Sequence, residues 1–94
     1  MRETRTVSVV IEGRVQGVSY RAWTESEARA RRLNGTVRNR DDGAVEAVFS
    51  GAPEAVAEML TLCRSGPPSA HVTDLTLREH ADAPSLSGFE ILRG

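Results

Sequence analysis

The chain has few cysteines and few aromatic residues. Its single cysteine, Cys63, cannot form an intramolecular disulfide, so the sequence gives no sign of an oxidising compartment. The aromatic residues are one Trp, one Tyr and two Phe, and none of them lies in the apolar segment at residues 7–11. RNA-binding modules of the common sheet type stack bases on exposed aromatics of their central strands. The shortage of aromatics therefore disfavours that class of protein.

Long apolar runs and a strong charge of one sign are also absent. The apolar stretch at residues 7–11 is too short for a signal-peptide core or a membrane span. The formal net charge of −1 argues against a protein that binds nucleic acid or membranes through a bulk positive field. The length of 94 residues suits one small core. We therefore expect a single cytoplasmic domain over residues 1–94, monomeric, with no nucleic-acid or membrane partner.

The first part of the chain reads as a strand followed by a helix. Apolar residues alternate over residues 7–12, which predicts a half-buried or central strand. Helix-forming residues without Gly or Pro predict a helix over 21–33, with Ser19 as its N-cap. Asn34-Gly35 follows, and either residue tolerates the left-handed conformation that ends many helices. We expect the helix to end there.

A hairpin is predicted next. The segments 36–40 and 44–49 alternate in polarity and flank the sequence Asp41-Asp42-Gly43. An Asp-Gly pair between two such segments is a strong hairpin signal. The hairpin also accounts for the two neighbouring aspartates without a catalytic role.

The second part of the chain repeats the pattern of helix and strand. Pro53 suits a first helical turn, and Gly66-Pro67-Pro68 suits a helix end. Between them, apolar residues recur at i, i+3, i+4 and i+7, which predicts a core-facing stripe; they are Val56, Met59, Leu60 and Cys63. Cys63 is therefore expected to be an inert core thiol. Beyond this helix we predict a strand over 71–79, a polar connection over 81–87 and a short last strand around Phe89 and Ile91.

This order of elements predicts the ferredoxin-like α/β sandwich. Two strand-helix-strand halves place both helices on one face of an antiparallel sheet, and the short last strand is an addition. The fold does not by itself define a function.

The loop from Gly13 to Arg21 has the composition of an anion-binding loop. Two glycines four positions apart allow positive φ, and the positive end of the following helix adds to the attraction. Arg21, in the first helical turn, can bind two oxygens of one phosphate. The spacing is not that of the nucleotide-binding loop G-x-x-x-x-G-K-[ST]. From spacing alone, a tight strand-to-helix connection with a surface arginine remains an alternative.

Other polar residues have simpler explanations. A group of arginines close in sequence could form a local basic rim, but a solvated helix face beside Glu25 and Glu27 is favoured; these are Arg29, Arg31, Arg32, Arg38 and Arg40. His71 and His80 have no metal-ligand spacing with cysteines or carboxylates, so surface positions are expected.

Several motifs together resemble the acylphosphatase family. The pattern G-x-V-Q-G-V-x-[FY]-R matches residues 13–21, G-x-V-x-N matches residues 35–39 and D-G-x-V-E matches residues 42–46. The resemblance extends over nearly the whole chain, from Val7 to Ile91. Motifs in this order and spacing are far more specific than one glycine loop.

The resemblance implies a metal-independent hydrolase of acyl phosphates that uses no cofactor and forms no covalent phosphoenzyme. It assigns Arg21 to binding of the phosphoryl group and Asn39 to orienting the attacking water. The phosphate-binding loop it implies is Val15, Gln16, Gly17, Val18, Ser19 and Tyr20. A non-catalytic module that binds an anion or a protein partner is the alternative, and the presence of both Arg21 and Asn39 favours the enzyme.

The chain departs from the family pattern at three places. Arg31-Arg32 stands where many members have Leu-Gly, which removes an apolar contact and a capping glycine. We therefore expect the helix end to fray or its cap to shift to Asn34 or Gly35. Thr36 replaces a frequent tryptophan. Tyr20 replaces the commoner phenylalanine and adds a hydroxyl that must reach water or a partner.

Overall fold

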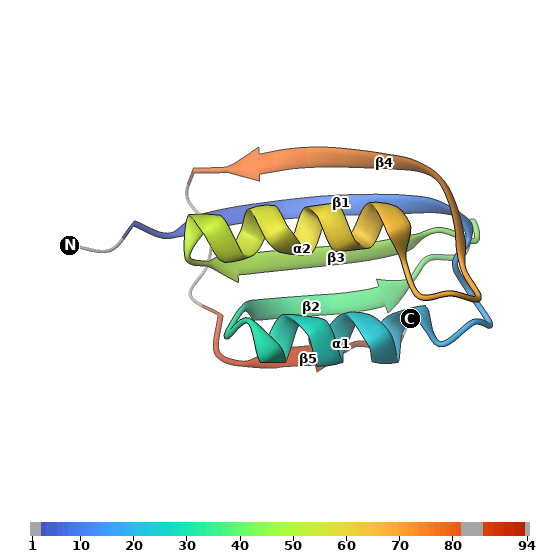
Figure 1. The fold of residues 1–94 in the computed structure, drawn as a ribbon, viewed down its shortest axis with the longest axis horizontal. Helices are drawn as coiled ribbons and strands as arrows, with labels where there is room; N and C mark the ends of the chain where they lie inside the picture. Colours follow the sequence, from blue (N-terminus) through green and yellow to red (C-terminus); the bar gives the residue numbers. More distant parts are fainter. Residues whose placement is uncertain (1–2, 82–85, 94) are drawn as a thin grey trace.

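The chain folds into one mixed sheet covered by helices on one side (Figure 1). A computed structural model describes residues 3–81 and 86–93. Within these residues there are five strands and two helices: β1 (Arg5–Arg14), α1 (Tyr20–Ala30), β2 (Asn34–Asn39), β3 (Val45–Gly51), α2 (Pro53–Ser65), β4 (His71–His80) and β5 (Phe89–Ile91). The ferredoxin-like fold is confirmed. Part of the predicted polar connection, residues 82–85, lies outside the described residues.

The strand order in the sheet is β4-β1-β3-β2-β5. Three neighbouring pairs are antiparallel, as predicted, while β5 joins the edge of the sheet parallel to β2. Strands β1, β2 and β5 therefore run in the same direction. Their C-terminal ends lie at the same end of the sheet, and the loop that leads into α1 starts there (Figure 1).

The core lies between the sheet and the two helices. Alternate residues of β1 and β3 face the helices in register, with Val7 opposite Phe49 and Val9 opposite Ala47, and these side chains are buried. The other face of the same two strands carries Ser8, Val10, Glu46 and Val48, without an aromatic residue. The described central strands thus lack the exposed aromatics that stack RNA bases.

Helix α2 packs through its predicted apolar stripe. Val56, Met59, Leu60 and Cys63 are its buried residues. The helix ends at Gly66, which has a φ of 69° and donates its N–H to the carbonyl of Leu62 at 2.7 Å. Burial raises the pKa of the Cys63 thiol to about 12, so this cysteine is an inert core residue, as expected.

The end of α1 differs from the prediction. The helix stops at Ala30, and Arg32 adopts the left-handed conformation with a φ of 57°. Leu33 N donates to Ala28 O at 2.9 Å and Arg32 N donates to Arg29 O at 3.0 Å. This pair of bonds is a Schellman motif, with the arginine at the position glycine prefers.

The expected cap at Asn34 or Gly35 is therefore wrong, since both residues already belong to β2. Burial of Leu33, which is 2% exposed, requires the chain to turn toward the core before Asn34. The apolar side chain thus decides where the helix ends, against the backbone preference of Arg32.

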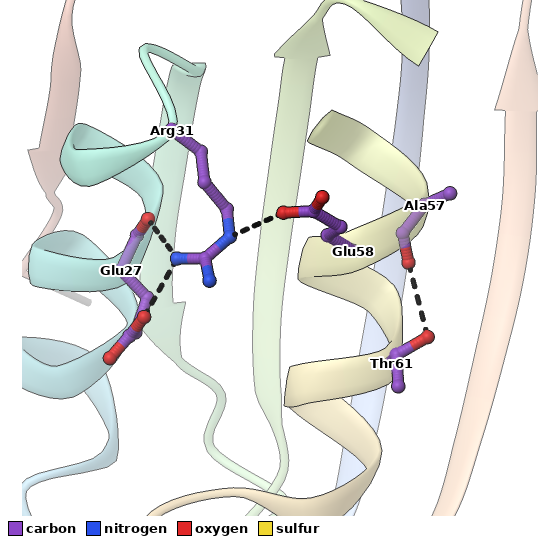
Figure 2. Close-up of polar contacts among 5 residues, drawn as sticks. All are labelled: Glu27, Arg31, Ala57, Glu58 and Thr61. Atoms are coloured by element: carbon purple, nitrogen blue, oxygen red, sulfur yellow. Dashed lines mark hydrogen bonds and ion pairs between the residues drawn. The ribbon is translucent and has the colours of Figure 1, made fainter. Parts of the chain in front are cut away.

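Arg31 joins the two helices, as Figure 2 shows. Its Nη1 donates to the carbonyl of Glu27 at 3.0 Å and pairs with the Glu27 carboxylate at 2.7 Å, while its Nε lies 3.3 Å from Oε1 of Glu58 on α2. The side chain is 25% exposed. Where an apolar contact was expected to be lost, a polar bridge replaces it.

Most of the suspected basic rim is neutralised. Three further arginines of the group form ion pairs with nearby carboxylates; the pairs are Arg29–Glu25, Arg38–Glu46 and Arg40–Asp42. The solvated, paired surface is therefore the correct interpretation.

The β2–β3 hairpin forms as predicted. Arg40 N donates to Ala44 O at 2.8 Å, and the side chain of Asp42 accepts the N–H of Ala44 at 3.1 Å. Asp42 thus has a structural role in the turn. In the described part of the chain, neither helix is long and apolar enough to cross a membrane.

Candidate active site

A surface hollow of about 570 Å³ lies at the end of the sheet where β1, β2 and β5 terminate. It is lined by the β1–α1 loop, the first turn of α1 and the ends of β2 and β5: Val15, Gln16, Gly17, Ser19, Tyr20, Arg21, Ala22, Asn39, Ile91 and Arg93. The predicted site residues come together here, with the exception of Val18. That residue packs against the core, and its carbonyl accepts the Ser69 hydroxyl at 3.2 Å.

The backbone of the loop has two left-handed residues. Gly17 has a φ of 74° and Ser19 a φ of 62°. Alternation of left-handed and ordinary residues turns successive N–H groups toward one side, which is the geometry of an anion-binding nest. A left-handed serine is strained, and such strain is found at functional sites. Both left-handed residues line the hollow.

Gly13 has a different role from Gly17. Its φ is 125°, and a Cβ at this position would lie 2.1 Å from the carbonyl oxygen of His71. Gly13 therefore allows β1 to approach β4 at the irregularity between Glu12 and Gly13. Gly13 does not line the hollow, and the first residue of the loop that does is Val15.

The N-terminus of α1 is open toward the hollow. Ser19 is at the N-cap position, as predicted, but its side chain makes no capping hydrogen bond. The first intrahelical bond is Trp23 N to Ser19 O at 3.0 Å, so the amides of Tyr20, Arg21 and Ala22 have no partner within the helix. The first turn contains no acidic residue. Free amides and the helix dipole together favour an anion here.

Arginine gives the hollow its charge. Arg21 and Arg93 both line it, and none of the lining residues that the structure describes is Asp or Glu. Within residues 3–81 and 86–93, Arg21 takes part in no ion pair. Arg21 is half-buried, and a guanidinium without an acidic partner is suited to binding a phosphoryl group through two oxygens.

Asn39, the last residue of β2, brings a buried acceptor to the same hollow. Its Oδ1 is buried and has no hydrogen-bond partner among the described residues. Leaving a buried acceptor unpaired costs about 1 to 3 kcal/mol, and strain, a catalytic role or a bound water accounts for such atoms. An oxygen in this state can accept a hydrogen bond from a bound water.

Two loop residues use their side chains elsewhere. Tyr20 is 1% exposed, and its hydroxyl donates to the carbonyl of Cys63 at 2.7 Å. Burial raises its pKa. The Gln16 amide donates to carbonyls of the β2–β3 hairpin. Both residues can therefore offer a ligand their backbone amides.

Sequence reasoning missed Ala22, Ile91 and Arg93. Ala22 could have been found, since it is within the first turn of the helix. Ile91 and Arg93 depend on the parallel pairing of β5 with β2, in which Ile91 lies opposite Val37 and Leu92 N donates to Val37 O at 2.8 Å. This pairing brings the end of β5 beside Asn39.

The histidines and metal-ligating residues are not part of the site. His71 and His80 are both exposed, and neither lines the hollow. In the described ranges, no three His, Cys, Asp or Glu side chains gather closely enough to hold a metal ion.

The fold and the site define a small ferredoxin-like domain whose hollow is lined by the start of α1, by Arg21 and Arg93 and by Asn39. The sequence profile of the acylphosphatase family matches residues 7–91. The chain therefore belongs to the acylphosphatase family, whose enzymes are hydrolases.

Individual relatives agree with this assignment. The chain is 57% identical to an acylphosphatase of Bradyrhizobium diazoefficiens, over 86% of this chain and 81% of the relative. It is 53% identical to one of Azorhizobium caulinodans, over 94% and 95% of the two chains. The crystal structure of acylphosphatase from Bacillus subtilis superposes with a TM-score of 0.91 at 34% identity, covering 94% of this chain and 98% of that one.

Proposed function

We propose that this hydrolase cleaves the carboxyl-phosphate bond of acyl phosphates, with the phosphoryl group held by the 15–20 loop and Arg21 and the attacking water oriented by Asn39. The observation that supports these roles best is the buried Oδ1 of Asn39, which has no hydrogen-bond partner among the described residues. Asn39 lines the same hollow as Arg21 and the first turn of α1, whose amides have no partner within the helix. A site that holds both an anion and a water beside it has the parts needed for hydrolysis.

Binding of the phosphoryl group follows from the donors present. Hydrogen bonds to a charged acceptor contribute about 1.5 to 3 kcal/mol each. A few loop and helix amides together with the Arg21 guanidinium are therefore enough to hold a phosphate dianion against competing water. No Asp or Glu is among the described residues of the lining, so none of these side chains repels the anion.

The chemical step needs little from the protein beyond position and charge. The water oxygen forms the new bond to phosphorus, while the bond from phosphorus to the acyl oxygen breaks and its electron pair leaves with the carboxylate. Asn39 accepts a hydrogen bond from the water but is too weak a base to take its proton, which passes to a phosphoryl oxygen of the substrate. Arg21 and the amides stabilise the charge on the equatorial oxygens.

Among the residues that the structure describes, no His, Cys, Asp or Glu lines the hollow. None of these lining side chains is a general base near neutral pH, so kcat should be nearly constant across the neutral range. A narrow bell-shaped profile that disappears in His71→Gln or His80→Gln would contradict the proposed mechanism.

The proposed enzyme is a cytoplasmic monomer that needs no cofactor, and its substrate is a small molecule. All residues assigned to the site come from one chain, and all of them except Val18 line one hollow. Activity should therefore be proportional to protein concentration down to the nanomolar range, and sedimentation should show a single species of 10.2 kDa.

The test is hydrolysis of acetyl phosphate and benzoyl phosphate with a chelator present. Arg21→Gln should lose both rate and binding of inorganic phosphate, because the charge-assisted contacts are lost. Asn39→Ala should lose chiefly kcat. Arg64→Gln, an exposed arginine at the end of α2, is the matched control and should behave as wild type.

Inorganic phosphate binding can be followed through the fluorescence of Trp23. Its ring centroid lies 5.3 Å from that of Tyr20, the last residue of the proposed phosphate-binding loop. Full activity of Asn39→Ala would overturn the water-orienting role. A wild type that binds phosphate but hydrolyses neither substrate would instead support a non-catalytic binding module.

A further inference from the structure

The side chain of Gln16 reaches from the phosphate-binding loop to the β2–β3 hairpin. Its Nε2 donates to Arg40 O and to Ala44 O, both at 2.9 Å. Carbonyl oxygens only accept hydrogen bonds, so the nitrogen of the carboxamide must face them. Both N–H groups of Gln16 are therefore used at the hairpin.

The two carbonyls lie at the base of the hairpin, one directly after β2 and one directly before β3. Ala44 O also accepts the N–H of Arg40 at 2.8 Å, and Arg40 O accepts that of Gly43 at 3.3 Å. Arg40 directly follows Asn39, whose buried Oδ1 is the proposed acceptor for water. One amide thus ties the phosphate-binding loop to the residue next to Asn39.

No other side-chain hydrogen bond among the described residues joins segment 15–19 to the hairpin. The loop is otherwise attached on a different side, where Ser69 donates to the carbonyl of Val18. Gln16 is therefore the direct side-chain link between the loop and the hairpin among the described residues.

We propose that Gln16 is a positioning residue, which fixes the place of Asn39 and its water relative to the phosphoryl group held by the loop. This role rests on the proposed function. In-line attack tolerates little displacement, and a shift of about 1 Å can lower a rate by about 100-fold. Loss of the Gln16 bonds should therefore lower kcat, while the loop amides and Arg21 continue to bind phosphate.

The first test replaces Gln16 by Met, which keeps the approximate length and shape and removes both donors. With acetyl phosphate as substrate, Gln16→Met should lower kcat by about 10-fold. The inhibition constant of inorganic phosphate should stay within about two-fold of wild type, because the loop amides and Arg21 bind the phosphate. The matched control is Arg38→Met, which breaks the ion pair with Glu46 in the same hairpin without touching the loop. It should keep the wild-type kcat.

The second test is a double-mutant cycle with Asn39→Ala. If Gln16 acts through Asn39, Gln16→Met should lower kcat by less than about two-fold once Asn39 has been replaced. If the factors by which the two substitutions lower kcat multiply fully in the double mutant, Gln16 acts independently of Asn39, and the proposal is overturned.

The outcomes separate this role from the proposed function. A wild type without acyl phosphate hydrolysis would contradict both. An active wild type with an unimpaired Gln16→Met would contradict the positioning role alone. An equal loss of kcat and of phosphate binding would make Gln16 a phosphate ligand, which also overturns the proposal. Should Gln16→Met fail to fold, Gln16→Asn, with the same amide one methylene shorter, gives the same comparisons.

Discussion

The hydroxyl of Tyr20 donates to the carbonyl of Cys63 at 2.7 Å and so joins the start of α1 to the last turns of α2. This carbonyl is among the last four of α2, which have no partner within the helix. Both residues are buried. The hydroxyl that sets Tyr20 apart from the phenylalanine commoner in the family thus satisfies a carbonyl of the neighbouring helix.

Tyr20→Phe should lower the free energy of unfolding by about 1 to 3 kcal/mol, because a buried carbonyl is left without a donor. Urea denaturation followed by far-UV circular dichroism measures the change. Thr61→Val is the matched control, because the Thr61 hydroxyl donates to Ala57 O at 3.2 Å in an exposed position of α2 (Figure 2). This substitution should change the free energy of unfolding by no more than about 0.5 kcal/mol. Equal effects of the two substitutions would contradict a role for the buried bond.

Arg32→Gly should stabilise the protein. Arg32 occupies the left-handed position of the Schellman motif with a φ of 57°, a conformation that costs a non-glycine residue about 1 kcal/mol. We expect the free energy of unfolding to rise by about 1 kcal/mol, less the entropy that glycine adds to the unfolded chain. Thermal denaturation provides the measurement.

The control for Arg32→Gly is the same substitution inside a helix. Arg64 lies in the last turn of α2, where glycine should cost about 1 kcal/mol relative to a good helix former. A loss of stability in both variants would show that the left-handed position carries no strain.

Alkaline pH should destabilise the fold. Burial raises the pKa of the Cys63 thiol from 9.0 to about 12, and burial also raises the pKa of Tyr20 from 10.0. A group with a raised native pKa contributes stability that is complete below its unfolded pKa and is lost as pH rises toward the native pKa. The free energy of unfolding should therefore fall above pH 9, by at most about 1.4 kcal/mol per pH unit for each group.

Cys63→Ala separates the two contributions. This variant should have a lower free energy of unfolding at neutral pH, because the shorter side chain leaves a cavity. Between pH 9 and 10, however, its free energy of unfolding should fall less steeply with pH than that of wild type, since only Tyr20 remains to titrate. Urea titrations at several pH values give both slopes. An unchanged slope would show that the thiol does not contribute.

The parts of the molecule predicted well from sequence are those fixed by local interactions. The Asp41-Asp42-Gly43 turn, the apolar stripe of α2 and the helix stop at Gly66 each depend on a few neighbouring residues and their φ/ψ preferences. The end of α1 was missed because burial of Leu33 outweighs the conformational preference of Arg32.

The family and the order of elements could be predicted from the sequence, because residue type and spacing carry them. The same motifs supplied the proposed assignment of residues to the phosphate and the water. Only the tertiary structure decided how those residues meet. The unpaired oxygen of Asn39, the bonds from Gln16 to the hairpin and the position of Arg93 depend on strand register and on contacts between distant segments. Such contacts are set by the packing of the whole core, which a local pattern does not contain.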